Sequence, residues 1–155
     1  MAYIISGLDG NVFAHLFGKD EHYLAAHRAV RVRAETASRY PDRIALRDVP
    51  EGENAILINH VYQSAESPYF GTHAIYIHEG ATTPGLYVDQ IPDYLATRLL
   101  SLRAFNDQHR IMTADVTPGH EAERLILQLL DRPDTRYIHA HSARFGCYLC
   151  LIERS

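Results

Sequence analysis

Short runs of β-branched and aliphatic residues, separated by turn residues, recur along the whole chain. Such runs are typical of strands, because strand side chains alternate between two faces and branched residues pack well on a pleated surface. The links between the runs are mostly hairpin-like, which favours antiparallel neighbours. With 155 residues the chain fits one compact domain. We expect strands at Tyr3–Ser6, around Val30 and Val32, around Ile44 and Leu46, and at Asn54–Tyr62, Thr72–His78, Leu86–Val88, Leu100–Phe105, Ile111–Val116, Arg136–His141 and Phe145–Arg154.

One segment carries a clear helical pattern. Thr117 can cap a helix there, Pro118 suits its first turn, and Pro133 stops it, so the pattern predicts a helix over residues 118–131. Shorter helices are expected within residues 11–24 and after Pro92. Many strands and few helices predict a single α+β domain over residues 1–155, with a mostly antiparallel sheet and helices packed on one face. The apolar face of the main helix consists of Ala122, Leu125, Ile126, Leu129 and Leu130.

Composition excludes several classes of partner. The formal net charge is −4 with histidine neutral, so no basic field would draw nucleic acid. No apolar run approaches the roughly 20 residues that a membrane helix needs. The first residues, Met1–Gly7, lack the charged and apolar regions of an export signal. We therefore expect a cytoplasmic protein that binds neither nucleic acid nor membrane; the sequence carries no signal for an oligomeric state.

The segment Arg136–Tyr148 holds a dense set of reactive side chains within strand-like sequence. His139 and His141 are two residues apart, so on a strand they share one face, with Cα atoms about 6.6–6.8 Å apart. Their imidazoles can converge on one ion, and imidazole suits Zn, Cu, Fe or Ni. The pair predicts a transition-metal site, for instance for zinc, or else two imidazoles that bond to neighbouring groups. The candidates for a third metal ligand are His60, His73, His78, Asp115 and Cys147.

Two arginines point to an anionic ligand. Arg103 lies within an apolar strand, and Arg144 lies at a turn. A buried guanidinium is costly unless it is paired, and its fork matches carboxylate or phosphate. We expect Arg103 and Arg144 to clamp a small anionic ligand beside His141, with Ser142 as a further ligand-binding side chain. The alternative is exposure, or an internal ion pair with Asp115 or Glu79.

Other side chains in or near this segment are candidates for chemistry. Cys147 could act as a nucleophile if nearby cations stabilise its thiolate. His141 or His73 could act as a general acid or base, because an ordinary imidazole pKa near 6.5 suits that role. Tyr69 could place a ligand-binding hydroxyl at the rim of a site. The structural alternatives are burial for Cys147, capping of a strand edge for His73 and ring packing for Tyr69.

The two cysteines are unlike a redox pair. Cys147 and Cys150 are three residues apart in strand-like sequence, so they face opposite sides of the strand. This spacing argues against a disulfide or a metal knuckle. Cys150 is expected to be a small buried hydrophobic residue.

Three motifs carry a resemblance to a known family. The stretches Ser67–Tyr69, Leu100–Phe105 and Tyr137–Tyr148 resemble the bacterial family of uncharacterised proteins labelled DUF1203, and the resemblance runs nearly end to end. It implies a bacterial cytosolic protein and supports the choice of site, but it implies no reaction. In this family Asn is expected more often at the position of Ser142.

Two classes of function follow from these observations. The first is an enzyme or binding protein for a small anionic metabolite, with a pocket lined by histidine and arginine. The second is a non-catalytic protein that binds a transition metal or another protein through His139 and His141. A cleft lined by Arg103, Arg144 and His141 would favour the first class, and converging imidazoles on a flat surface would favour the second.

Overall fold

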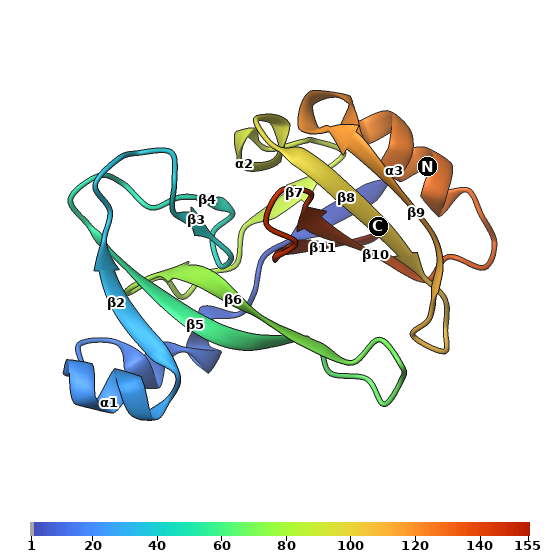
Figure 1. Cartoon of the computed structure of the whole chain (residues 1–155). Helices are drawn as coiled ribbons and strands as arrows, with labels where there is room; N and C mark the ends of the chain where they lie inside the picture. The colour runs from blue at the N-terminus through green and yellow to red at the C-terminus, as the bar shows by residue number, and fades with distance from the viewer. Residues whose placement is uncertain (1) are drawn as a thin grey trace.

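The computed structural model describes residues 2–155, which form two main antiparallel sheets (Figure 1). The strands are β1 (Tyr3–Ser6), β2 (Ala29–Arg33), β3 (Pro41–Asp42), β4 (Arg47–Asp48), β5 (Asn54–Gln63), β6 (Gly71–His78), β7 (Leu86–Val88), β8 (Leu99–Phe105), β9 (Ile111–Pro118), β10 (Tyr137–Ser142) and β11 (Tyr148–Arg154). The six-stranded sheet has the order β7-β1-β11-β10-β8-β9, and the three-stranded sheet has the order β2-β5-β6. The predicted α+β class is confirmed, with the strands divided between two sheets and a β3-β4 ribbon.

The helices are short and lie on the outsides of the sheets. Helix α3 (Ala122–Leu130) covers one face of the six-stranded sheet, while α1 (Glu21–Ala26) lies beside β2 of the smaller sheet (Figure 1). Helix α2 (Asp93–Ala96) leads into β8, and the 3-10 turns are η1 (Gly10–Val12), η2 (Ala14–Leu16) and η3 (Gly119–Glu121). Within residues 2–155, no helix has the length and apolar character that crossing a bilayer requires.

Helix α3 supplies the apolar face that the sequence predicts. Ile126 and Leu130 are fully buried and Leu129 is nearly so, and all three belong to the core of the six-stranded sheet. The predicted start of the helix is wrong. Strand β9 stays paired with β8 through Pro118, and the Thr117 hydroxyl donates to the Pro118 carbonyl instead of capping a helix. Strand pairing therefore extends over residues that resemble a helix cap, and the α-helix begins only after η3.

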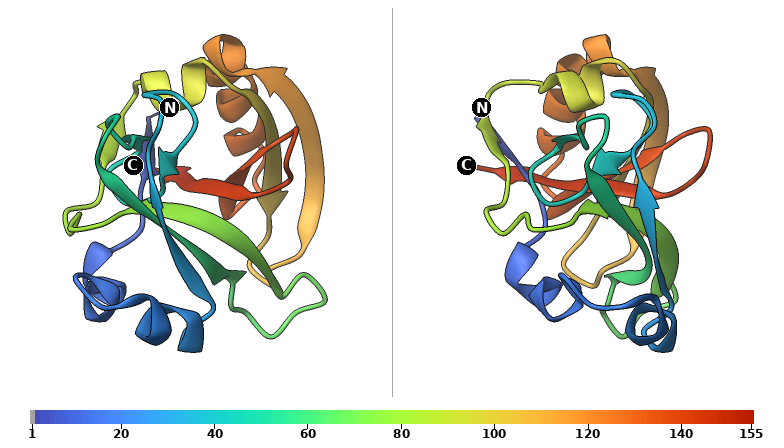
Figure 2. Two further views of the ribbon diagram at one scale, coloured as in Figure 1. Left: turned by 60° about the vertical axis from the view of Figure 1, so that its left-hand side comes forward. Right: turned by 90° about the vertical axis from the view of Figure 1, so that its left-hand side faces the viewer.

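Strand β10 is buried on both faces. Ile138 and Ala140 belong to the core beneath α3, so Tyr137, His139 and His141 lie on the opposite face. In both views of Figure 2, β5 and β6 run close to β10 and β11. The ring of Tyr62 on β5 lies with its centroid 5.0 Å from that of His141. The face that carries the histidines is thus covered by the smaller sheet.

The strand predicted around Ile44 and Leu46 is wrong, because the chain turns there between β3 and β4. The Asp42 carboxylate accepts hydrogen bonds of 2.9 Å from the backbone N–H groups of Ile44, Ala45 and His78. Ile44 is buried in the core of the smaller sheet and Leu46 in that of the larger one. The alternating apolar residues are buried as expected, but in a turn that a carboxylate stabilises.

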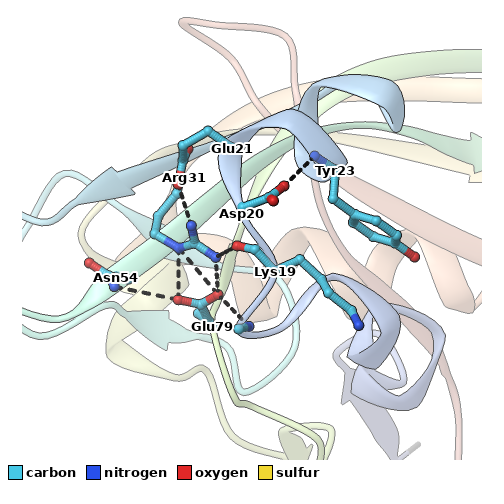
Figure 3. Close-up of polar contacts among 8 residues, drawn as sticks. Lys19, Asp20, Glu21, Tyr23, Arg31, Asn54 and Glu79 are labelled. Carbon is cyan, nitrogen blue, oxygen red and sulfur yellow. Dashed lines mark hydrogen bonds and ion pairs between the residues drawn. The ribbon is translucent and has the colours of Figure 1, made fainter.

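An ion-pair network ties α1 to the smaller sheet (Figure 3). The Arg31 guanidinium on β2 donates to both carboxylate oxygens of Glu79, at 2.8 Å and 3.0 Å, and also pairs with Glu21 on α1. Hydrogen bonding to Arg31 holds the pKa of Glu79 below its usual range. Glu79 is therefore occupied by Arg31, and it is not the partner of Arg103 or Arg144 that the sequence allowed.

The packing of α3 predicts a large effect of truncating its buried face. Ile126→Ala is expected to lower the free energy of unfolding by about 2–5 kcal/mol, because the removed atoms leave a cavity in a closed core. Arg124→Ala, at an exposed position of the same helix, should change it by no more than about 0.5 kcal/mol. Denaturant unfolding measures both. A loss below about 1 kcal/mol for Ile126→Ala would contradict the packing.

Candidate functional site

A cavity of about 790 Å³ lies where the smaller sheet faces the loop between β10 and β11. Leu57 on β5 and Tyr76 on β6 form part of one wall, and the loop over residues 143–147 forms part of the other. Among the described residues that line it there is no aspartate or glutamate. Its polar lining includes Arg39, Arg43, Arg98, Arg144, His73 and Cys147. The cavity therefore combines positive charge with a thiol.

A tight backbone turn shapes the loop between β10 and β11. The Ser142 N–H donates to the Cys147 carbonyl, and the Gly146 N–H donates to the Ser142 carbonyl, both at 2.8 Å. Gly146 has a φ of 78°, a left-handed conformation that glycine adopts without strain. The turn leaves Arg144 and Phe145 at its tip, where Phe145 is 80% exposed. Two cavity residues are thus held on a short loop by backbone bonds.

Arg43 is the most deeply buried cation at the cavity, with a relative exposure of 1%. Its Nε donates to the Tyr148 carbonyl and one Nη to the Pro41 carbonyl, each at 2.8 Å. The other Nη lies 3.0 Å from Cys147 Sγ. The neighbouring Asp42 carboxylate bonds to backbone N–H groups, and within residues 2–155 no carboxylate forms an ion pair with Arg43. A buried guanidinium is thus satisfied by two carbonyls and a sulfur.

The other arginines of the cavity differ in whether a carboxylate balances their charge. Arg98 forms an ion pair of 2.7 Å with Asp48, so its charge is already balanced. Over the described part of the chain, neither Arg39 nor Arg144 is in an ion pair. Sequence reasoning missed Arg39, Arg43 and Arg98, because nothing in their local sequence distinguishes them from surface arginines. Only the fold brings them together.

Four of the side chains predicted from the sequence meet at this cavity: His73, Ser142, Arg144 and Cys147. His73 is half-buried on β6, with Nδ1 3.0 Å from the Ala74 carbonyl. The fold brings these four side chains to one cavity, while the roles assigned to them stay predictions.

Arg103 and Tyr69 are not among the residues that line this cavity. Arg103 lies on β8 opposite His139, and its Nε donates to Ser101 Oγ at 3.2 Å. The ring of Tyr69 packs edge-on against Phe105, with centroids 6.0 Å apart. The structure therefore does not bring Arg103 and Arg144 together in a clamp around this cavity, because the loop carries Arg144 past the end of β8, whereas Arg103 points from the middle of that strand.

His139 and His141 are buried among aromatic rings beside the cavity. His141 Nδ1 lies 2.9 Å from the Gly146 carbonyl, while His141 Nε2 and His139 Nδ1 have no hydrogen-bond partner within residues 2–155. Burial, followed by the charges of His141, Arg103 and His109, lowers the pKa of His139 to about 3. Burial also lowers the pKa of His141 to about 4, against the opposing effect of the bond to Gly146. Both imidazoles are therefore neutral at pH 7.

The geometry gives the histidine pair no third metal ligand from the described residues. The ring centroids of His139 and His141 are 6.3 Å apart. Across residues 2–155, however, no group of three or more His, Cys, Asp or Glu side chains is arranged to hold a metal ion. Among the candidate ligands, His60 is half-buried and packs on Phe13, a residue of the core of the smaller sheet, at a centroid distance of 5.6 Å. Asp115 is exposed on β9. The metal site stays a prediction that rests on two imidazoles alone.

Comparison with known proteins identifies a family without assigning a function. Residues 39–154 match the family described as "Protein of unknown function (DUF1203)". The matched segment includes every arginine that lines the cavity. No curated protein and no solved structure matches the chain.

The buried histidines predict a specific dependence of stability on pH. The pKa of His139 is lower in the folded protein than the ordinary value of 6.5, so below that pH the unfolded chain binds a proton that the folded one excludes. The free energy of unfolding should therefore fall as the pH falls from about 6.5 towards 3, by about 2 kcal/mol for this residue at pH 5.

His139→Phe should remove this part of the pH dependence, since phenylalanine fits an aromatic environment and does not titrate. Denaturant unfolding at pH 7 and pH 5 measures the difference, with exposed His22→Phe on α1 as the control. If His139→Phe loses as much stability as the unaltered protein on acidification, His139 is not held neutral by burial.

Proposed function

The chain belongs to the DUF1203 family, and we propose that it binds a small anionic ligand in the arginine-lined cavity between its two sheets. Arg144 and Arg39 contact the ligand from the rim, and Arg43 presents its charge from the wall. Ser142 and His73 add hydrogen-bonding groups at the same cavity.

The observation that carries this proposal is the unbalanced positive charge of the cavity. Hydrogen bonds to two carbonyls and a sulfur hold the Arg43 guanidinium, but they bring no opposite charge to balance its positive charge. Arg43 is 1% exposed and has no carboxylate partner within residues 2–155, and no acidic side chain lines the cavity there. An anion that enters the cavity would meet guanidinium groups, whose forked donors match carboxylate and phosphate.

The apolar part of the lining supports a ligand with an apolar body. Besides the arginines, the cavity is lined by aliphatic and aromatic side chains from both sheets and from the loop. A volume of about 790 Å³ lies within the usual range for small-molecule sites. The ligand should therefore carry an anionic head and an apolar portion. The apolar lining includes Leu57, Tyr76, Leu99, Phe145 and Leu149.

We also propose a bacterial, cytoplasmic setting for this activity. A reducing compartment suits a protein whose two cysteines, Cys147 and Cys150, are both free thiols.

Phenyl phosphate, inorganic phosphate and phenol are suitable probes, because they separate the anionic head from the apolar body. Isothermal titration calorimetry should show the strongest binding for phenyl phosphate, since it contacts both kinds of lining. Binding of phenol as strong as that of phenyl phosphate would contradict an anion site.

Arg144→Lys should weaken binding of phenyl phosphate by about tenfold although the charge is kept, because lysine lacks the fork that donates two parallel hydrogen bonds. Arg124→Lys, on the exposed surface of α3, is the matched control. Arg103→Lys should also leave the affinity unchanged, because Arg103 does not line the cavity. Equal affinity in Arg144→Lys and the unaltered protein would exclude a clamp at Arg144.

A further inference from the structure

Cys147 lies in the wall of the cavity with its thiol next to a cation. Its relative exposure is 9%, whereas Cys150, on the same strand region, is fully buried and does not line the cavity. A backbone hydrogen bond from the Ser142 N–H to the Cys147 carbonyl closes the loop and fixes the position of the cysteine. The two thiols of the chain thus differ in their access to a ligand.

The Arg43 guanidinium gives the sulfur a positively charged donor. Two of its nitrogens are held by backbone carbonyls of Pro41 and Tyr148, and these bonds leave the third nitrogen 3.0 Å from Cys147 Sγ. A cationic N–H bonds more strongly to an anionic acceptor than to a neutral one. No carboxylate balances the charge of Arg43 within residues 2–155. Of the three acceptors that bond to Arg43, only the sulfur of Cys147 can carry a negative charge, as a thiolate.

We propose that Cys147 is a nucleophile, held by Arg43, that reacts with a small anionic molecule carrying an electrophilic carbon. This inference rests on the proposed anion site and names its substrate class. A lone pair of the thiolate forms a new S–C bond, while the bond from that carbon to its leaving group breaks and the leaving group departs with the bonding electrons. The thiol proton passes to solvent before the attack. No oxidant or reductant is needed.

The placement of the arginines favours this class of substrate over a neutral one. Arg144 and Arg39 lie on the same cavity as the thiol. A cleft lined by one sign of charge raises the local concentration of oppositely charged molecules and their rate of association. An anionic electrophile is therefore drawn to the wall that carries Cys147, while a neutral one is not.

Paired alkylating reagents test the inference directly on the full chain. Iodoacetate is an anionic electrophile and iodoacetamide is its neutral counterpart, and each transfers a carbon to sulfur with loss of iodide. Peptide mass spectrometry measures the alkylation rate at Cys147 and at Cys150 separately. The iodoacetate-to-iodoacetamide rate ratio at Cys147 should exceed that of N-acetylcysteine at the same pH by about tenfold or more, with Cys150 unmodified in the folded protein.

Substitutions assign the effect to particular groups. Arg144→Gln should bring the rate ratio at Cys147 down towards that of N-acetylcysteine while iodoacetamide still reacts. Arg43→Lys should slow both reagents, because lysine lacks the fork that reaches the sulfur. Circular dichroism checks that each variant folds. If Arg43→Lys does not fold, Arg144→Gln, at an exposed position, still tests whether the cavity selects anionic electrophiles.

The outcomes separate this inference from the proposed function. If Cys147 stays unmodified by both reagents while phenyl phosphate still binds, the nucleophile is rejected and the anion site stands. If Cys147 reacts with both reagents at the rate ratio of N-acetylcysteine, the selection of anionic substrates by the thiol is rejected, and the phenyl phosphate titration decides separately whether the anion site stands. A folded Arg43→Lys variant that reacts like the unaltered protein would overturn the role of Arg43.

Discussion

The turn between β3 and β4 is the constraint on which the two sheets and the cavity depend. Its backbone bonds to three other segments: the Arg43 carbonyl accepts from the Leu8 N–H, the Arg43 N–H donates to the Tyr76 carbonyl, and the Ile44 carbonyl accepts from the Gly85 N–H, at 2.8–3.2 Å. The Asp42 carboxylate satisfies further N–H groups inside the turn. A buried turn must account for all of its backbone polar groups. These bonds satisfy backbone groups of Arg43, Ile44 and Ala45, and they hold neighbouring segments of both sheets in place.

The turn between β3 and β4 also determines which side chains meet at the cavity. Because the turn lies between the two cores, its charged side chain, Arg43, points to β11 and the loop before it rather than to solvent. The loop that ends in Gly146 then places Arg144 and Cys147 on the same cavity. The cation and the thiol come from positions 104 residues apart in the chain. Their contact is produced by the docking of the turn against the end of β10 and the start of β11.

Local patterns predicted the parts of the fold in which neighbouring residues pair. The β8–β9 hairpin forms as its alternating residues indicated, and the apolar stripe of α3 packs where its spacing indicated. The same alternation at Ile44 and Leu46 was misleading, because a stabilised turn buries those residues as well as a strand would. For the site, Arg144 and Cys147 could be found because reactive residues interrupt a strand pattern. Arg43 could not, because its importance comes from distant partners.

The sequence by itself determined the class of the fold, the strands near the C-terminus, the main helix and the segment that carries the loop of the site, since period-2 and period-3.6 patterns act within a few residues. Only the tertiary structure decided that the strands divide into two sheets, that His139 and His141 are buried and neutral, and that Arg43 rather than Arg103 meets the loop. Burial and charge compensation depend on every segment packed around a group. A local pattern of residues therefore cannot predict the burial or the charge compensation of a group.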